Sequence, residues 1–260
     1  MEEVQPRRSA LKAFGLSLAA AAVIGGREAD AATTASLVPE GAKDLRDLQA
    51  RLARAPRRRD YKTSSMVLTD AKDWDHEALA ELIAYKGKFK QIWDNVAIDG
   101  PWLNLMRNAL NTQIWSFRHP DYLAVSGTHS LAHLALFDQA MWEKYSLPRL
   151  AGEKFKTNTL IIDHSEGKDP KDFEKPDGLF SPAETTIPVL QRRGVVFLAC
   201  HNAIWEISER LIKMDINPDK LAHDAMCAEL TNHLIPGCVL TPGVVGTALE
   251  LQLAGFQYAK

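Results

Sequence analysis

Cysteine and histidine supply the side chains with the clearest chemical potential in this sequence. Cys200 ends the short apolar run 194–199 and is followed directly by His201 and Asn202, where a helix is expected to begin. The positive end of a helix dipole and a neighbouring imidazolium both favour the thiolate, which is the nucleophilic form of cysteine. The sequence therefore predicts a reactive thiol at Cys200, with a buried and inert cysteine as the alternative.

A second kind of chemistry is open at two histidines that stand four residues apart. His129 and His133 follow another apolar run, and a helix from Ser130 onward would direct both side chains the same way. Because strands of a parallel sheet end at the same edge, His129, His133 and His201 could together bind zinc or copper. In the main hypothesis, His129 and His201 instead tune or orient Cys200.

The other cysteines and the missing motifs narrow the range of reactions. The chain has three cysteines, so at least one thiol is unpaired within a monomer. We expect Cys227 and Cys238 to be two buried thiols rather than a disulfide. The sequence has no phosphate-binding loop, dinucleotide-binding glycine motif, serine nucleophile elbow or Cys-x-x-Cys pair. Nucleotide hydrolysis, dinucleotide oxidoreduction, serine hydrolysis and thioredoxin-like exchange are therefore not expected.

Short apolar runs that alternate with helical periods must position these side chains, a pattern typical of a parallel sheet covered by helices. Strands are expected at residues 88–93, 122–126, 159–162, 194–200, 238–241 and 256–259. Helices are expected at residues 102–115, 136–145, 182–192, 203–214 and 247–254, with a further helical region at 217–234. The segment 152–179 is dense in Lys, Asp and Pro and is expected to be a surface insertion.

The first 32 residues have the order of an export signal. Arg7 and Arg8 precede Leu11-Lys12, a weakly apolar stretch at 13–24 and small residues at 29–32. This order predicts a twin-arginine signal peptide, and therefore a periplasmic protein that is exported after folding. The apolar stretch is shorter than the ~20 residues that span a bilayer, so no stable membrane anchor is expected after cleavage. Export after folding favours a bound cofactor, but its identity stays unknown.

Residues 33–87 are expected to form a helical extension that precedes an α/β domain at 88–260. Leucines at helical spacing predict a helix within 43–53, and residues 73–85 predict a second, amphipathic helix. The arginines between these helices are expected on a solvated face: Arg54, Arg57, Arg58 and Arg59. The formal net charge of −2 gives no electrostatic reason to bind a polyanion, so nucleic acid is not an expected partner.

Three stretches resemble the DsrE-like family of sulfur-relay proteins. Residues 193–202, Arg-Gly-Val-Val-Phe-Leu-Ala-Cys-His-Asn, are similar to the segment in which a strand ends in the family's cysteine. Residues 234–258 resemble the closing segment, in which a Pro-Gly turn leads into a strand, a Val-rich crossover, a helix with Leu-Gln and a final Gly-aromatic-x-Tyr. Residues 122–145 are similar to the second strand and the loop after it.

The resemblance implies a three-layer α/β/α fold with a mainly parallel sheet of about five strands. It also implies a homo-oligomer, either a trimer or a hexamer. Cys200 would match the family's cysteine, which in some members carries a persulfide sulfur between proteins. The partner would then be a sulfur donor or acceptor protein or a small thiol ligand, with Asn202 and Gly243 as ligand-binding residues.

Two departures from the family keep other functions open. The family's sulfur carriers are mostly cytoplasmic, whereas this chain is expected to work in an oxidising compartment. The extension and the insertion also lie outside the family core. A non-catalytic oligomeric binding module is therefore a further alternative, and the sequence leaves open whether the protein is an enzyme.

Overall fold

The computed structural model describes residues 35–260, so the predicted signal peptide lies outside the described residues. A five-stranded sheet forms the centre, with strand order β4-β3-β2-β1-β5 and parallel pairing throughout. The strands are β1 (Lys90–Asn95), β2 (Leu123–Thr128), β3 (Val196–Cys200), β4 (Val239–Thr241) and β5 (Gln257–Ala259). The predicted α/β class with a parallel sheet is thereby confirmed.

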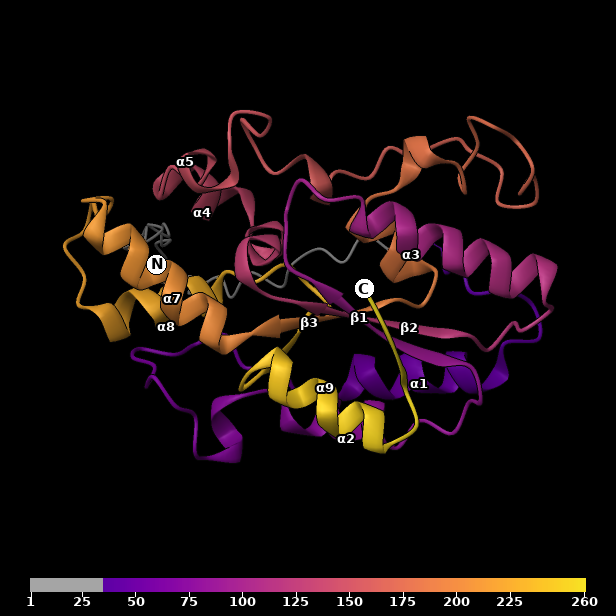
Figure 1. Ribbon diagram of the computed structural model, residues 1–260, viewed down its shortest axis with the longest axis horizontal. Helices are drawn as coiled ribbons and strands as arrows, with labels where there is room; N and C mark the ends of the chain where they lie inside the picture. Colours follow the sequence, from indigo (N-terminus) through magenta and orange to yellow (C-terminus); the bar gives the residue numbers. More distant parts are fainter. Residues whose placement is uncertain (1–34) are drawn as a thin grey trace, which may run out of the picture. The chain divides into compact units, whose positions relative to one another are not determined.

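Helices cover both faces of this sheet, which gives three layers (Figure 1). One face carries α1 (Lys43–Arg54), α2 (His76–Ile83) and α9 (Val244–Leu253). The other side carries α3 (Trp102–Asn111), α4 (Gln139–Lys144), α5 (Pro148–Ala151), α6 (Ile187–Arg192), α7 (His201–Lys213) and α8 (His223–Asn232). The residues predicted as an N-terminal extension thus supply α1 and α2 to the layer that α9 completes.

Alternation along the strands divides the interior into two cores. In β3, Leu198 and Cys200 pack in the core beneath α1, α2 and α9, whereas Phe197 and Ala199 pack in the core on the other side. This is the two-residue period of a strand that is buried on both faces. The side chain of Cys200 therefore points toward the layer that contains α9.

One predicted strand takes a different form in the structure. Thr159–Ile161 is a single 3-10 turn, not a strand, and it packs against α6 and the 3-10 helix Ser130–Leu136. Its β-branched residues favour a strand, but strand propensity acts only where a neighbouring strand is available for pairing. The following residues, 162–179, contain neither a helix nor a strand.

The predicted solvated arginine face is wrong for Arg57 and Arg59. The two terminal nitrogens of the Arg59 guanidinium, Nη1 and Nη2, donate to the carboxylate of Asp75 at 3.1 and 2.8 Å, and Arg57 Nε lies 3.7 Å from the same carboxylate. The Asp75 side chain is 1% exposed and also accepts the backbone N–H of Leu240 at 2.7 Å. We call Arg57, Arg59 and Asp75 the arginine clamp, because they fasten the segment before α2 to β4.

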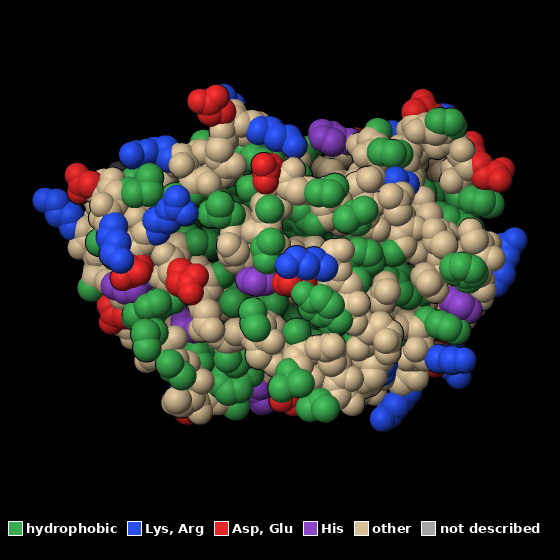
Figure 2. All heavy atoms as spheres, in the orientation of Figure 1, with side chains coloured by type: hydrophobic (Ala, Val, Ile, Leu, Met, Phe, Trp, Pro, Cys, Tyr) green, Lys and Arg blue, Asp and Glu red, His purple; other side chains and the backbone are tan. Residues whose placement is uncertain are grey.

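The surface carries both signs of charge. On the face shown in Figure 2, Lys and Arg side chains are interspersed with Asp and Glu, and hydrophobic side chains occupy much of the remaining area. None of the helices within residues 35–260 is both long and apolar enough to cross a membrane.

Candidate functional site

The carboxyl ends of the strands bring Cys200 and His129 to the same edge of the sheet. Thr128 of β2 pairs with Ala199 of β3, so the next residues, His129 and Cys200, are neighbours in register. His129 continues the ladder, since its N–H donates to Asn95 O at 3.0 Å. The edge that the sequence predicted for the thiol and the first histidine is therefore formed.

Two helices begin at Cys200. Helix α7 starts at the next residue, and Val244, the first residue of α9, donates its N–H to Cys200 Sγ at 3.3 Å. The backbone N–H groups of Asn202 and Ala203 also interact with the sulfur. A negative charge on this sulfur would thus be stabilised by backbone donors at the positive ends of two helices.

Burial of Cys200 opposes the effect of these N–H donors, because it destabilises the thiolate. The residue is 4% exposed. Burial raises the pKa of the Cys200 thiol, although the N–H groups of Val244, Ala203 and Asn202 lower it in part. The expected shift toward the thiolate is therefore wrong in sign for the resting protein, because desolvation outweighs the helix termini.

Gly127 allows α9 to approach the sheet this closely. A Cβ at this position would lie 2.9 Å from Val244 Cγ1 and 3.1 Å from Trp93 O. Since backbone atoms cannot move aside, a side chain here would displace the first turn of α9. The contact between Val244 N–H and Cys200 Sγ therefore depends on a glycine in β2.

The predicted ligand-binding residues Asn202 and Gly243 lie against each other. A Cβ at Gly243 would lie 2.7 Å from Asn202 Nδ2, so the amide occupies the space that a side chain would take. Asn202 is exposed and Gly243 is half-buried. The structure thus brings these two residues together next to Cys200, at the surface above the buried sulfur.

His129 is held by an acidic partner that the sequence did not reveal. Its Nε2 lies 2.7 Å from Asp94 Oδ1, and the hydroxyl of Tyr258 donates to Asp94 Oδ2 at 2.5 Å. Burial raises the pKa of Asp94, but the hydrogen bonds from Tyr258 and His129 outweigh it, and the net pKa is lowered. Asp94 is therefore an ionised carboxylate that orients the imidazole. A polar residue near the end of an apolar strand is the signal that could have identified it.

His201 does not supply the positive charge that the sequence predicted. Its ring is buried, Nε2 lies 2.7 Å from Ser65 O, and burial lowers the pKa of His201. The imidazole is neutral at neutral pH, and its Nε2 is hydrogen bonded to the loop before α2. Within residues 35–260, Cys200 Sγ forms no hydrogen bond with His129 or His201.

The alternative metal site at His129, His133 and His201 is not assembled. In the described part of the chain, no three His, Cys, Asp or Glu side chains are arranged to hold a metal ion. Residues Ser130–Leu136 form a 3-10 helix with three residues per turn, so positions four apart do not share a face as they would in an α-helix. His133 is fully buried without a hydrogen-bond partner at either ring nitrogen, and burial lowers its pKa to about 3.

The other cysteines behave as predicted. Cys227 and Cys238 are buried free thiols, and burial raises the pKa of each to about 12. They are therefore inert references for Cys200.

Comparisons with protein-family models, with curated proteins and with solved structures found no match to this chain.

Proposed function

We propose that this protein is an exported, DsrE-like sulfur-handling protein in which Cys200 carries a persulfide. The observation that carries the proposal is the position of Cys200 Sγ at the start of both α7 and α9, where it accepts the N–H of Val244 at 3.3 Å. The five-stranded parallel sheet with a cysteine at the carboxyl end of an inner strand supports the resemblance on which the family assignment rests.

The proposed step is an exchange of one sulfur atom. The Cys200 thiolate attacks the outer sulfur of a donor persulfide, R–S–SH. The new bond joins Cys200 Sγ to that sulfur, the donor S–S bond breaks, and the donor leaves as the thiolate R–S⁻. An acceptor thiolate reverses these events in the next step, so neither transfer requires an external oxidant or reductant.

The raised pKa of Cys200 means that transfer of sulfur to this residue would require a base. Because burial raises this pKa, the unloaded residue is a thiol that must lose a proton before it attacks. We assign His129 as the base, since it is the neighbour in register and Asp94 orients its ring. A persulfide is more acidic than a thiol, so the loaded form places an anion at the two helix termini.

Intact-mass analysis of the protein isolated from the periplasm tests this proposal. A fraction of the wild-type protein is expected to carry the mass of one additional sulfur atom, which a reductant removes and which is missing from Cys200→Ser. Cys227→Ser is the matched control, because Cys227 is also a buried thiol, and it should keep the added sulfur. Added sulfur that persists in Cys200→Ser would overturn the assignment.

One observation favours a second candidate, a non-catalytic binding module. Cys200 is 4% exposed, which is typical of a cysteine that packs as a small hydrophobe. In that case the folded protein should carry no added sulfur, and an alkylating reagent should modify Cys200 no faster than Cys227 or Cys238. The two candidates therefore give opposite results in one mass measurement.

We also propose export by the twin-arginine pathway, on the order of residues in 1–32. Replacing Arg7 and Arg8 by lysine should keep the full-length precursor in the cytoplasm, whereas Lys12→Arg should leave export unchanged. Export of the doubly substituted chain would contradict the proposal.

A homo-oligomer is the assembly that we propose. The support is an exposed apolar stripe on α9, where Val245, Leu249 and Leu253 are 71%, 57% and 75% exposed at a spacing of one helical turn. Leu249→Asn should lower the molar mass measured by light scattering, and Leu105→Asn, an exposed leucine on α3, should not. A wild-type monomer at all concentrations would contradict it.

A further inference from the structure

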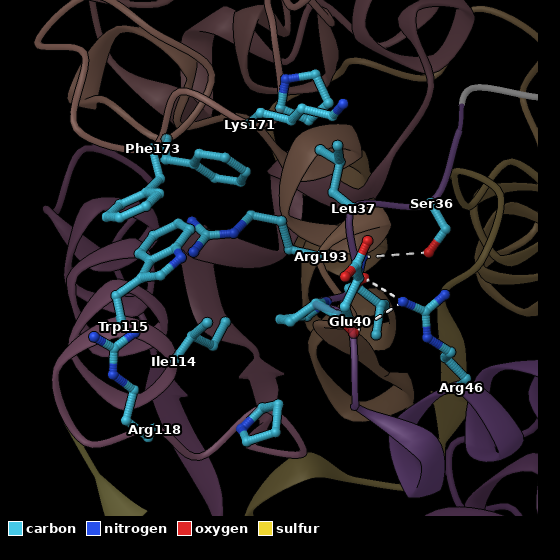
Figure 3. A pocket seen from close by; sticks show the side chains of 15 residues that line it. Ser36, Leu37, Glu40, Arg46, Ile114, Trp115, Arg118, Lys171, Phe173 and Arg193 are labelled. Carbon is cyan, nitrogen blue, oxygen red and sulfur yellow. Dashed lines mark hydrogen bonds between the residues drawn. The ribbon is translucent and has the colours of Figure 1, made fainter.

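A cavity of about 840 Å³ lies at the opposite edge of the sheet from Cys200. Its lining includes Pro120, which precedes β2, and Arg193, which precedes β3, so the cavity opens at the amino ends of these strands. The segment before α1 and the loop 170–180 close its sides. In Figure 3 the Arg193 side chain extends toward the rings of Trp115 and Phe173.

Arg193 is a buried cation without an anionic partner. The residue is 1% exposed, and its Nη2 donates to the neutral amide oxygen of Asn111 at 2.7 Å. The guanidinium lies over the rings of Phe180 and Trp115, at 4.9 and 5.5 Å from their centroids. Within residues 35–260 it forms no salt bridge, and the charged group that acts on it is another arginine, Arg107.

The guanidinium of Arg107 likewise donates its hydrogen bonds to neutral protein oxygens. Its Nη1 donates to Phe180 O at 3.1 Å, and its other nitrogens donate to the side-chain oxygens of Asn104 and Asn108. Among the described residues, no acid forms an ion pair with either of these two neighbouring guanidiniums, although Glu40 contributes one carboxylate to the cavity lining. Burial and the like charge of Arg107 lower the pKa of Arg193 to about 9, which still leaves it protonated at neutral pH.

A buried charge that lacks a counter-charge is unfavourable, and proteins normally pair it with an acid. The arginine clamp follows that rule, since Asp75 serves both Arg57 and Arg59. No described acid forms an ion pair with Arg193, which instead lines an open cavity. A negatively charged group that enters the cavity would supply the counter-charge.

The other lining residues indicate which kind of molecule would carry this anionic group. Arg118 and Lys171 add positive charge, and Arg46 is directed to the carbonyl oxygens of Val38 and Pro39. The wall is aromatic, because Trp115 stacks on Phe173 with centroids 4.9 Å apart and packs edge-on to Phe180 at 4.8 Å. These rings suit a planar apolar body, which a bare inorganic anion lacks.

We propose that this cavity binds a small organic anion, a planar apolar body that carries a carboxylate or phosphate group. Arg193 is the buried counter-charge, Arg118 and Lys171 attract the anion at the mouth, and Trp115 with Phe173 packs on the apolar body. The site is independent of Cys200 and of the sulfur chemistry proposed for it.

Calorimetric titration of the mature protein with four probes tests the chemistry of the ligand. The probes are 2-naphthoate, 2-naphthyl phosphate, the neutral 2-naphthamide and inorganic phosphate. At least one naphthyl anion should bind about tenfold or more tightly than 2-naphthamide and than inorganic phosphate, as expected for a charge-assisted contact to a guanidinium. The order of the two naphthyl anions distinguishes a carboxylate from a phosphate ligand. Equal binding of 2-naphthamide, or no saturable binding of either anion, overturns the proposal.

Variants connect the binding to Arg193. Arg193→Met should weaken the preferred anion by about tenfold or more, and Arg118→Gln with Lys171→Gln should weaken it by smaller factors. If Arg193→Met does not fold, Asn111→Asp gives the same test, because it supplies a competing carboxylate next to Arg193 Nη2. Arg149→Gln, an exposed arginine on α5, is the matched control. Cys200→Ser should bind the anion normally, which separates this site from the sulfur chemistry. Unchanged binding in both Arg193→Met and Asn111→Asp would overturn the assignment.

Discussion

The arginine clamp and the Arg193 cavity both contain buried arginine side chains, but they differ in whether a carboxylate pairs with the charge. In the clamp, the carboxylate of Asp75 receives Arg59 through two hydrogen bonds and lies within 3.7 Å of Arg57. At the cavity, Arg193 is more deeply buried than either, and its guanidinium contacts an amide oxygen and two aromatic rings without an ion pair to any described acid. A buried arginine that is already neutralised is part of the framework. One that is left without an acid next to open space points to a ligand.

Asp75→Asn should have the largest effect on stability. The substitution leaves two half-buried guanidiniums without a counter-charge and weakens the acceptor of the Leu240 N–H. Breaking a buried ion pair in this way costs about 3–5 kcal/mol in the free energy of unfolding. Urea denaturation followed by circular dichroism measures it. A loss below about 1 kcal/mol would show that the clamp is a surface feature.

The two thiols Cys238 and Cys200 allow a similar comparison for a negative charge, the thiolate. Cys238 lies next to the cationic clamp and is completely buried, and its pKa is raised to about 12. Cys200 is buried as well, but the N–H donors of two helices partly offset the rise in its pKa. Below the pKa, alkylation of Cys200 should accelerate about tenfold per pH unit, because the thiolate fraction rises by that factor.

Peptide mapping after timed alkylation between neutral and mildly alkaline pH measures these rates. Cys200 should be modified first, with Cys227 and Cys238 protected until the protein unfolds. Equal rates at all three sites would mean that the helix termini have no effect on the sulfur of Cys200.

Asn111→Asp should convert the cavity into a second clamp. The new carboxylate would pair with Arg193 but would lose the hydrogen bond from Asn111 Nδ2 to Phe180 O. We expect a net stabilisation of about 1 kcal/mol together with the loss of anion binding. Asn108→Asp, at an exposed contact of Arg107, is the control. Destabilisation without any effect on anion binding would contradict the comparison.

The exposed pair Arg51–Glu81 should show the smallest effect. Both side chains are more than a third exposed, although Nε and Oε2 are 2.6 Å apart. Water screens such a pair, so Glu81→Gln should change the free energy of unfolding by only about 0–1 kcal/mol. A loss comparable with that of Asp75→Asn would show that burial does not decide the strength of these pairs.

Periodicity predicted the five strands of the sheet and the edge at which Cys200 and His129 lie, but it also predicted a strand at 159–162 that does not form. The apolar runs that end at Thr128 and Cys200 are buried on both faces, and parallel strands place their carboxyl ends together. The meeting of Asn202 with Gly243 follows from the same rule.

The electrostatics of the site could not be predicted from sequence. The pKa of Cys200 depends on how tightly α9 packs, which in turn depends on Gly127 in a distant strand. Asp94 pairs with a histidine on the next strand, and Asp75 pairs with arginines across a loop. These pairs form only because the fold brings the two residues together, and a local sequence pattern carries no information about such contacts.

The layer that covers Cys200 is built from helices far apart in the sequence, at 43–83 and at 244–253, and this determines when it can form during synthesis. Helices α1 and α2 precede the other described elements, but α9 and the edge strand β5 lie within residues 244–260 and are synthesised after them. Contacts of such long sequence separation form late and slowly. A nascent or truncated chain therefore exposes the apolar face of the sheet and lacks the Val244 N–H at the sulfur. Closure of this face therefore waits until residues 244–260 have been synthesised.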